Sequence, residues 1–282
     1  MFRRPHRSND RVEKNIKLKK SYKDPTKLSK LQKSFDQGSL LASSLASPIV
    51  TFTVGKEGRL FAAHEDVLSL SPYFATATRG QFFEAQSMRI SLPDEEPEIF
   101  SCVLEYLYKG DYYPRLIHNR RRNSWEFEDA GHSPNPENTG GRGSVEATSY
   151  ISSVGEHLLK DTVIYCAAEK YGLEELKRVA LRKQGLQSGI EVATILRSAR
   201  YAYDNTPDTD SRLRAHYLAL IIRCRKTFKR SGTMQAEMES GGKLFFDLFV
   251  ALCNHVDDIV DIGLTDFQAR NFKSPKTIRQ AA

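Results

Sequence analysis

The chain has 282 residues, a net charge of +7, 40% hydrophobic residues and a mean hydropathy of −0.49. This much apolar material can build a core, but the negative hydropathy indicates that part of the chain stays outside it. Residues 1–47 hold twelve Lys and Arg against four Asp and Glu, so they carry +8 and the remaining chain about −1. The net charge is therefore no sign that the folded part binds nucleic acid.

The cysteines are too far apart to suggest a disulfide scaffold or a structural zinc site, and no CxxC pair occurs. They stand at Cys102, Cys166, Cys224 and Cys253. The longest dense apolar stretch, residues 244–253, is interrupted by Asp247 and is too short to span a bilayer. The first ten residues lack the apolar core of a secretory signal. We expect a protein of the cytoplasm or nucleus that binds no metal and makes no membrane contact.

The first half of the chain changes from an arm to a mixed α and β pattern. Residues 1–46 are basic and poor in apolar residues, which predicts disorder. Residues 49–54 and 59–64 are β-rich and flank a GKEG turn, which is typical of a hairpin. Two short helices broken at Ser71-Pro72 follow, then a strand over 87–93 and a helix that ends at Gly110.

The second half is predicted to be helical after an interruption. Residues 115–153 are crowded with Pro, Gly, Asn and Ser, which indicates a long disordered insertion. A helical pattern resumes at Glu156, with Leu158, Leu159 and Val163 on one face, and stops at Gly172. A second helix follows at once, and three more patterns then cover residues 190–203, 211–229 and 243–260.

Taken in order, these segments resemble the BTB/POZ domain, and the short fungal BTB proteins most of all. The resemblance rests on TFTVG, FAAHEDVLSLSPYF, FFEA, ISLPDEEPEIFSCVLEYLYKGDYY and AAEKYGLEELK, and covers about residues 48–114 and 154–182. It implies an α+β fold, a small sheet with a cluster of short helices, followed by an all-helical C-terminal extension. It also implies a non-enzymatic protein-interaction module without a cofactor, often dimeric and frequently an adaptor on a cullin ubiquitin ligase.

We divide the chain accordingly into four parts. Residues 1–46 are the basic arm, and residues 47–183 are the BTB/POZ domain with its insertion at about 115–153. Residues 184–272 are the helical extension, and 273–282 are a tail.

His64 has two interpretations, a ligand or general base, and a structural histidine at a strand–helix junction. No second His or Cys stands near it in the sequence, so the spacing favours the structural role. The resemblance agrees, because the corresponding family histidine is structural.

Phe82-Phe83-Glu84 is the candidate partner-binding motif. Cullin-docking BTB proteins carry a hydrophobic–any–Glu triplet between the short helices and the third strand, and this triplet matches it. Phe82 would enter a cullin pocket and Glu84 would fix its orientation. The alternative is that the aromatic side chains belong to the core and that Glu84 is only solvated.

Two departures from the family pattern bear on self-association. The family usually opens its first strand with an Asp that helps to form the dimer site, and Pro48 stands there instead. Glu65 replaces the usual basic residue after the histidine. Both dimer and monomer therefore remain open.

Three other possible roles concern phosphorylation, nucleic-acid binding and catalysis. Ser124, downstream of Arg120, Arg121 and Arg122, is a candidate phosphorylation site for a basic-directed kinase, or simply part of a solvated run. The basic arm, residues 1–46, could bind nucleic acid electrostatically, which would make the chain a nuclear or chromatin-associated regulator. An enzyme is disfavoured, because none of the GxSxG, HExxH, GxxxxGK[ST] or GxGxxG patterns occurs.

Overall fold

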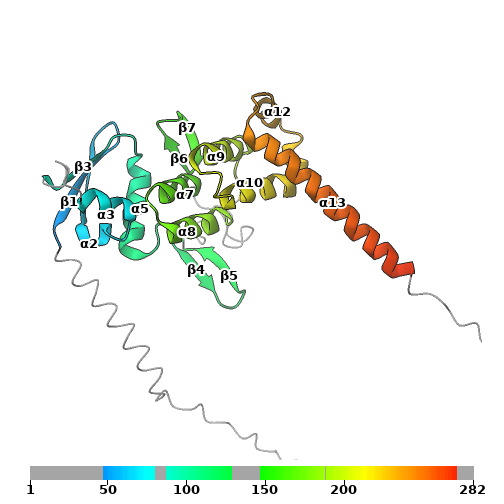
Figure 1. Cartoon of the computed structure of the whole chain (residues 1–282), viewed down its shortest axis with the longest axis horizontal. Coiled ribbons are helices and arrows are strands. Elements are labelled where there is room, and N and C mark those ends of the chain that lie inside the picture. The colour runs from blue at the N-terminus through cyan, green and yellow to red at the C-terminus, as the bar shows by residue number, and fades with distance from the viewer. Residues whose placement is uncertain (1–46, 80–86, 129–146, 188, 272–282) are drawn as a thin grey trace, which may run out of the picture. The chain divides into compact units, whose positions relative to one another are not determined.

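The computed structural model describes residues 47–79, 87–128, 147–187 and 189–271, the last ten as backbone only (Figure 1). The chain divides into two units, Met1–Ala46 and Ser47–Ala282. The predicted arm, the Phe82–Glu84 motif and the 273–282 tail all lie outside the described residues.

A three-stranded sheet begins the described fold. It contains β1 (Ile49–Val54), β2 (Arg59–His64) and β3 (Arg89–Leu92) in the order β2-β1-β3. β2 runs antiparallel to β1, with Ile49 opposite His64, whereas β3 runs parallel to it. The predicted hairpin and third strand are thus confirmed.

Short helices cover this sheet because the apolar face of β1 needs a partner. They are α2 (Glu65–Leu68), α3 (Pro72–Arg79) and α5 (Pro97–Lys109). Phe52 of β1 contacts Phe74 of α3 and Phe100 of α5, with ring centroids 5.6 and 5.0 Å apart. α5 ends at Gly110, whose φ of 74° suits a glycine that terminates a helix.

One hairpin and the first strand of a second hairpin lie where the sequence predicted a disordered insertion. The first pairs β4 (Leu116–Asn119) with β5 (Ser124–Phe127), and the second pairs β6 (Thr148–Ile151) with β7 (Glu156–Leu159). The prediction of disorder is therefore wrong for these residues, and residues 129–146 lie outside the described ranges. The few large side chains provide the order, since Phe127 is 2% exposed and the guanidinium carbon of Arg182 lies 4.6 Å from the centroid of the Trp125 ring.

Two helices follow the second hairpin, α7 (Lys160–Lys170) and α8 (Glu174–Gln184). The sequence placed the start of the first helix four residues too early, because Leu158 and Leu159 belong to β7 instead. Both leucines are buried, and a strand pairing with β6 buries them as well as a helix would. Gly172, with a φ of 69°, separates the two helices as expected.

The described part of the chain ends with five helices: α9 (Val192–Asn205), α10 (Arg212–Arg223), α11 (Arg225–Phe228), α12 (Gly232–Glu239) and α13 (Lys243–Asn271). The pattern over 211–229 forms two helices that separate at Cys224, and α12 was not expected. The fold is α+β with a helical C-terminal region, as predicted.

The main buried cluster runs from Val50 in β1 to Leu244 in α13, so it crosses the proposed boundary at residue 183 without a break. A buried hydrogen bond from the backbone of Leu159 to Ser198 Oγ, 2.9 Å long, joins β7 to α9. The division into domain and extension stays a prediction, but the described part of both shares one core.

None of the helices within the described ranges combines the length and the apolar content that crossing a bilayer requires.

Candidate interaction surfaces

The corner after β2 fixes His64 by two hydrogen bonds to one side chain. Its backbone N–H donates to Tyr108 Oη over 2.9 Å, and its Nδ1 lies 2.7 Å from the same oxygen. Tyr108 belongs to α5, so His64 ties the sheet edge to the longest helix of this part. In the part of the chain that the structure describes, no group of three His, Cys, Asp or Glu could hold a metal ion. These contacts give His64 a structural role.

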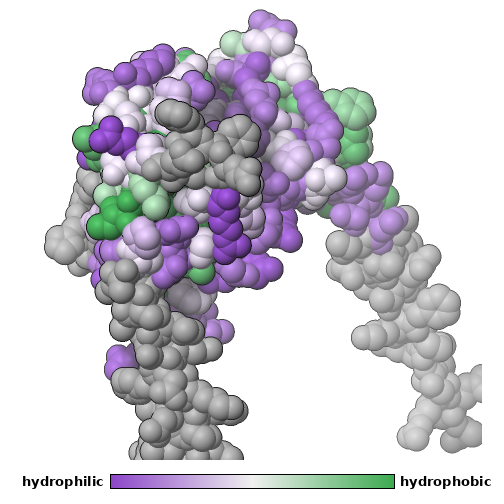
Figure 2. All heavy atoms as spheres, turned by 60° about the vertical axis from the view of Figure 1, so that its left-hand side comes forward, coloured by the Kyte–Doolittle hydropathy of each residue, from purple (hydrophilic) through white to green (hydrophobic). Residues whose placement is uncertain are grey.

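Pro48 lies at the start of the sheet and contributes backbone but no charge. Its carbonyl oxygen accepts a hydrogen bond from the Glu65 N–H over 2.9 Å, which closes the corner between β1 and α2. Several large apolar side chains of the sheet and the segments beside it are exposed: Ile49, Leu60, Leu70, Tyr73 and Met88. Exposed apolar patches on a small domain are typical of interaction surfaces, and Figure 2 shows apolar side chains among polar ones on the side of the molecule that faces the reader.

The predicted cullin-docking residues cannot be placed. Phe82 and Glu84 lie between α3, which ends at Arg79, and β3, which begins at Arg89, outside the described residues. Their role stays a prediction.

Ser124 is the first residue of β5 and is half-buried opposite Asn119 of β4. The three arginines upstream of Ser124 lie in the turn of the hairpin. There, Arg122 Nη1 lies 3.8 Å from Glu126 Oε1. The sequence placed Ser124 in a flexible loop, and the strand position corrects that. Phosphorylation of Ser124 stays a prediction, and it would place a dianion at the end of a short hairpin.

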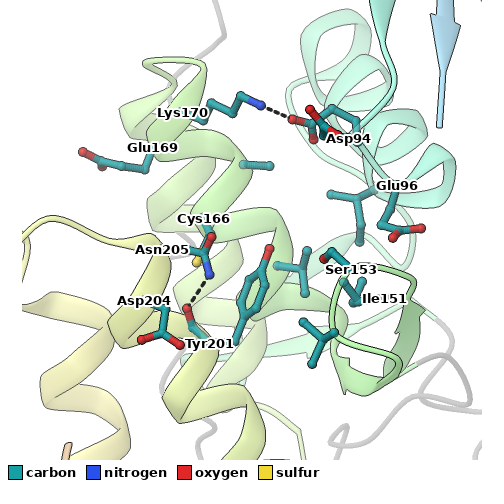
Figure 3. A pocket seen from close by; sticks show the side chains of 15 residues that line it. Asp94, Glu96, Ile151, Ser153, Cys166, Glu169, Lys170, Tyr201, Asp204 and Asn205 are labelled. Carbon is teal, nitrogen blue, oxygen red and sulfur yellow. Dashed lines mark hydrogen bonds and ion pairs between the residues drawn. The ribbon is translucent and has the colours of Figure 1, made fainter. Parts of the chain in front are cut away.

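An acidic hollow of about 510 Å³ lies at the junction between the β3–α5 loop and the helices (Figure 3). Three carboxylates come from the loop between β3 and α5, and others from α7 and α9: Asp94, Glu95, Glu96, Glu169 and Asp204. Figure 3 shows Tyr201 between α7 and the turn of the second hairpin, with Glu169 and Asp204 on the helical side. We refer to this cavity as the acidic groove.

Internal contacts account for part of its charge. Lys170 is paired with Glu95, and Glu96 accepts hydrogen bonds from the backbone and hydroxyl of Ser152 over 2.6 and 3.2 Å. Asp94 and Asp204 are exposed at its edge. Glu169 is likewise paired with Lys177, so two of the five carboxylates are bound to lysines. The groove keeps a net negative charge, and a lysine or arginine side chain is its chemical complement.

The groove does not contain the parts of a nucleophilic site. Burial, with Asp210 and Glu169 nearby, raises the pKa of the Cys166 thiol, which keeps it protonated and unreactive. Burial likewise raises the pKa of the Tyr201 hydroxyl. The described lining therefore favours recognition of a partner over chemistry.

Sequence reasoning missed this groove because its carboxylates come from three segments that are separated by 35 residues or more and span residues 94–204. Taken alone, Asp94, Glu95 and Glu96 fit the acidic residues that favour a helix N-terminus. The sequence did contain a sign of the groove, because three consecutive acidic residues are more than the N-terminus of one helix needs for its stabilisation.

Comparison with known protein families identifies one segment of the chain. Residues 49–118 match the BTB/POZ domain family, which covers the sheet and α2 to β4. The BTB/POZ domain is a protein–protein interaction module, generally without enzymatic activity, and BTB domains often dimerise. No curated protein matches this chain.

Proposed function

We propose that the chain is a non-enzymatic adaptor, in which the BTB domain binds protein partners, including a second copy of itself. The observation that carries this proposal is the match of residues 49–118 to the BTB/POZ domain, on a fold whose core continues into helices that border an acidic groove. The adaptor would bind one partner through the BTB domain and another through the helical region.

The acidic groove, which lies between the β3–α5 loop and helices α7 and α9, is the surface that we expect a second partner to contact, through a basic side chain. The double variant Asp94→Asn/Asp204→Asn removes two exposed charges without touching the core. It should weaken binding of partner proteins that co-purify with the unmodified chain by about tenfold. The matched control Glu191→Gln/Glu239→Gln removes two exposed charges elsewhere and should leave binding unchanged. Equal loss in both double variants, or in neither, would contradict a role for the groove.

A finer proposal is that one partner of the BTB domain is a cullin scaffold, bound through Phe82 and Glu84. It is supported by the position of the triplet between α3 and β3. In a pull-down, the double variant Phe82→Ala/Glu84→Ala should lose a cullin that the unmodified chain retains. Equal retention by both chains, or retention by neither, refutes this assignment while the broader adaptor role stands.

The second candidate function is nucleic-acid binding through the arm, favoured by the charge of +8 on residues 1–47. Such binding would be salt-dependent and show little sequence preference. Retention of DNA or RNA by the full chain, compared with residues 47–282 at two salt concentrations, tests it. If neither chain is retained, or if both are retained equally, the arm does not bind nucleic acid in this way.

A further inference from the structure

α13 has two apolar faces, and the described elements cover only one of them. Leu244 and Leu248 are each 3% exposed and belong to the buried clusters formed with α9 and α10. A second set of apolar side chains on the same helix is solvent-exposed: Phe246 (68%), Phe249 (65%), Val250 (40%), Val256 (55%) and Val260 (51%). Figure 2 shows apolar side chains along the limb that α13 forms, above its grey continuation.

The spacing of the exposed face is that of a coiled-coil seam. Phe246, Phe249, Cys253, Val256 and Val260 follow one another at intervals of three and four residues, which are the a and d positions of two heptads. Cys253 is exposed in the middle of the run. From Phe246 to Val260 the helix rises fourteen steps, about 21 Å. We call these five residues the α13 seam.

A seam with this repeat is complementary to another helix with the same repeat, because each knob fits a hole formed by four facing residues. The aromatic side chains lie in the first half of the α13 seam and the smaller valines in the second half. An antiparallel second copy would place Phe246 and Phe249 against Val256 and Val260, so that large side chains face small ones.

The charges select the same arrangement. Asp257, Asp258 and Asp261 are all exposed and lie beside the second half of the seam, whereas the first half carries Asp247 and, at its start, Lys243. A parallel pair would bring the acidic ends of the two helices together, with Asp257, which flanks the seam, nearest to its counterpart. An antiparallel pair separates the two acidic clusters. Lys243 does not add to this preference, because it is already paired with Asp208.

We propose that the α13 seam packs antiparallel against the α13 seam of a second copy of this chain, as a two-fold symmetric interface. This contact uses none of the residues that match the BTB/POZ domain. It is therefore independent of self-association through that domain and can add to it.

Cys253 provides a position-specific test in the full-length chain. A short bis-maleimide should cross-link two copies through Cys253, because Cys102 and Cys166 are buried and Cys224 is half-buried. Cys253→Ser should abolish the cross-linked dimer. Phe249→Glu should reduce it about tenfold or more, since the interface would bury an unpaired charge. Met238→Glu, which places the same charge at an exposed apolar site of α12, should leave it unchanged.

Two variants in the Cys253→Ser background test the orientation. An antiparallel pair predicts cross-links between Phe246→Cys and Val260→Cys chains when they are mixed, and little when each is alone. Cross-links within each separate variant would overturn the antiparallel arrangement. A Phe249→Glu chain that keeps its circular dichroism spectrum and cross-links as well as the unmodified chain would overturn the interface altogether. If the Phe249→Glu chain loses the Cys253 cross-link but still self-associates, the seam is supported and the remaining self-association occurs through a separate contact.

Discussion

At the scale of single residues, a buried cation joins helix α8 to the segment that follows α5. Lys183 of α8 is fully buried. Its Nζ lies 2.6 Å from Asp111 Oδ1 and donates a hydrogen bond to the carbonyl oxygen of Tyr112. Its Nζ also lies 3.4 Å from the centroid of the Tyr112 ring. Burial lowers the pKa of Lys183, because the carboxylate of Asp111 offsets only part of the lost hydration.

Lys183→Met should reduce the free energy of unfolding by about 3–5 kcal/mol, because Asp111 and the Tyr112 carbonyl lose their partner. Denaturant unfolding measures this value. Arg178→Met is the control on the same helix, since the Arg178–Glu175 pair is exposed and worth at most about 1 kcal/mol. The double variant Lys183→Met/Asp111→Asn should recover part of the loss. A loss for Lys183→Met no larger than that for Arg178→Met would show that the buried pair is not stabilising.

Asp210 gives the fold a predicted dependence on pH. Burial alone would raise its pKa, but hydrogen bonds from Lys177 and Tyr165 lower it below its ordinary value of 3.8. A carboxyl group whose pKa is lower in the folded state stabilises the fold above its unfolded pKa. That contribution is lost as the pH falls through the folded pKa.

Asp210→Asn should therefore be less stable near neutral pH and should lose less of its stability below about pH 4 than the unmodified chain. Unfolding curves across a pH series measure the difference. Asp258→Asn, at an exposed position of α13, should keep the original dependence. Identical pH profiles for Asp210→Asn and the unmodified chain would contradict the assignment.

At the scale of elements, the β4–β5 hairpin is part of the packed structure. Phe127 is 2% exposed, and Trp125 lies against Arg182 of α8. Asp111 accepts the backbone N–H of Leu116 over 2.8 Å, so the residue that pairs with Lys183 also holds the first strand of the hairpin.

Phe127→Ala should cost about 3–5 kcal/mol in the free energy of unfolding, as truncating a buried aromatic side chain does. Ile117→Ala, on the same hairpin but at a position that is 53% exposed, should cost less than about 1 kcal/mol. Thermal and denaturant unfolding provide both values. Equal and small effects would mean that the hairpin adds nothing to the stability of the fold.

The sequence predicted those elements whose patterns are local. The first hairpin, the third strand, α5 and α9 each carry an apolar period and a clear stop, such as Gly110. After Leu116 and Ile117 at the start of β4, residues 118–127 contain only two large apolar side chains, Trp125 and Phe127. The ordered structure of this hairpin depends on α8, some sixty residues later in the chain. Leu158 and Leu159 fit a helix and a strand equally well, and only the pairing with β6 decides between them. The acidic groove was missed because distant segments build it.

At the scale of the whole molecule, the described residues from β1 to α13 share one core, so interaction surfaces on the sheet and on the helices belong to a single packed support. The exposed apolar residues near Pro48, the acidic groove and the α13 seam are three separate surfaces of that support. This arrangement is suited to an adaptor, which must present more than one surface at once.

The interaction role is tested most directly by affinity purification of the tagged full-length chain from cells that also contain an untagged copy, followed by mass spectrometry. The proposed function predicts recovery of the untagged copy, of a second protein in comparable amount, or of both. Recovery of the tagged chain alone would contradict the conclusion that this is a protein-interaction adaptor.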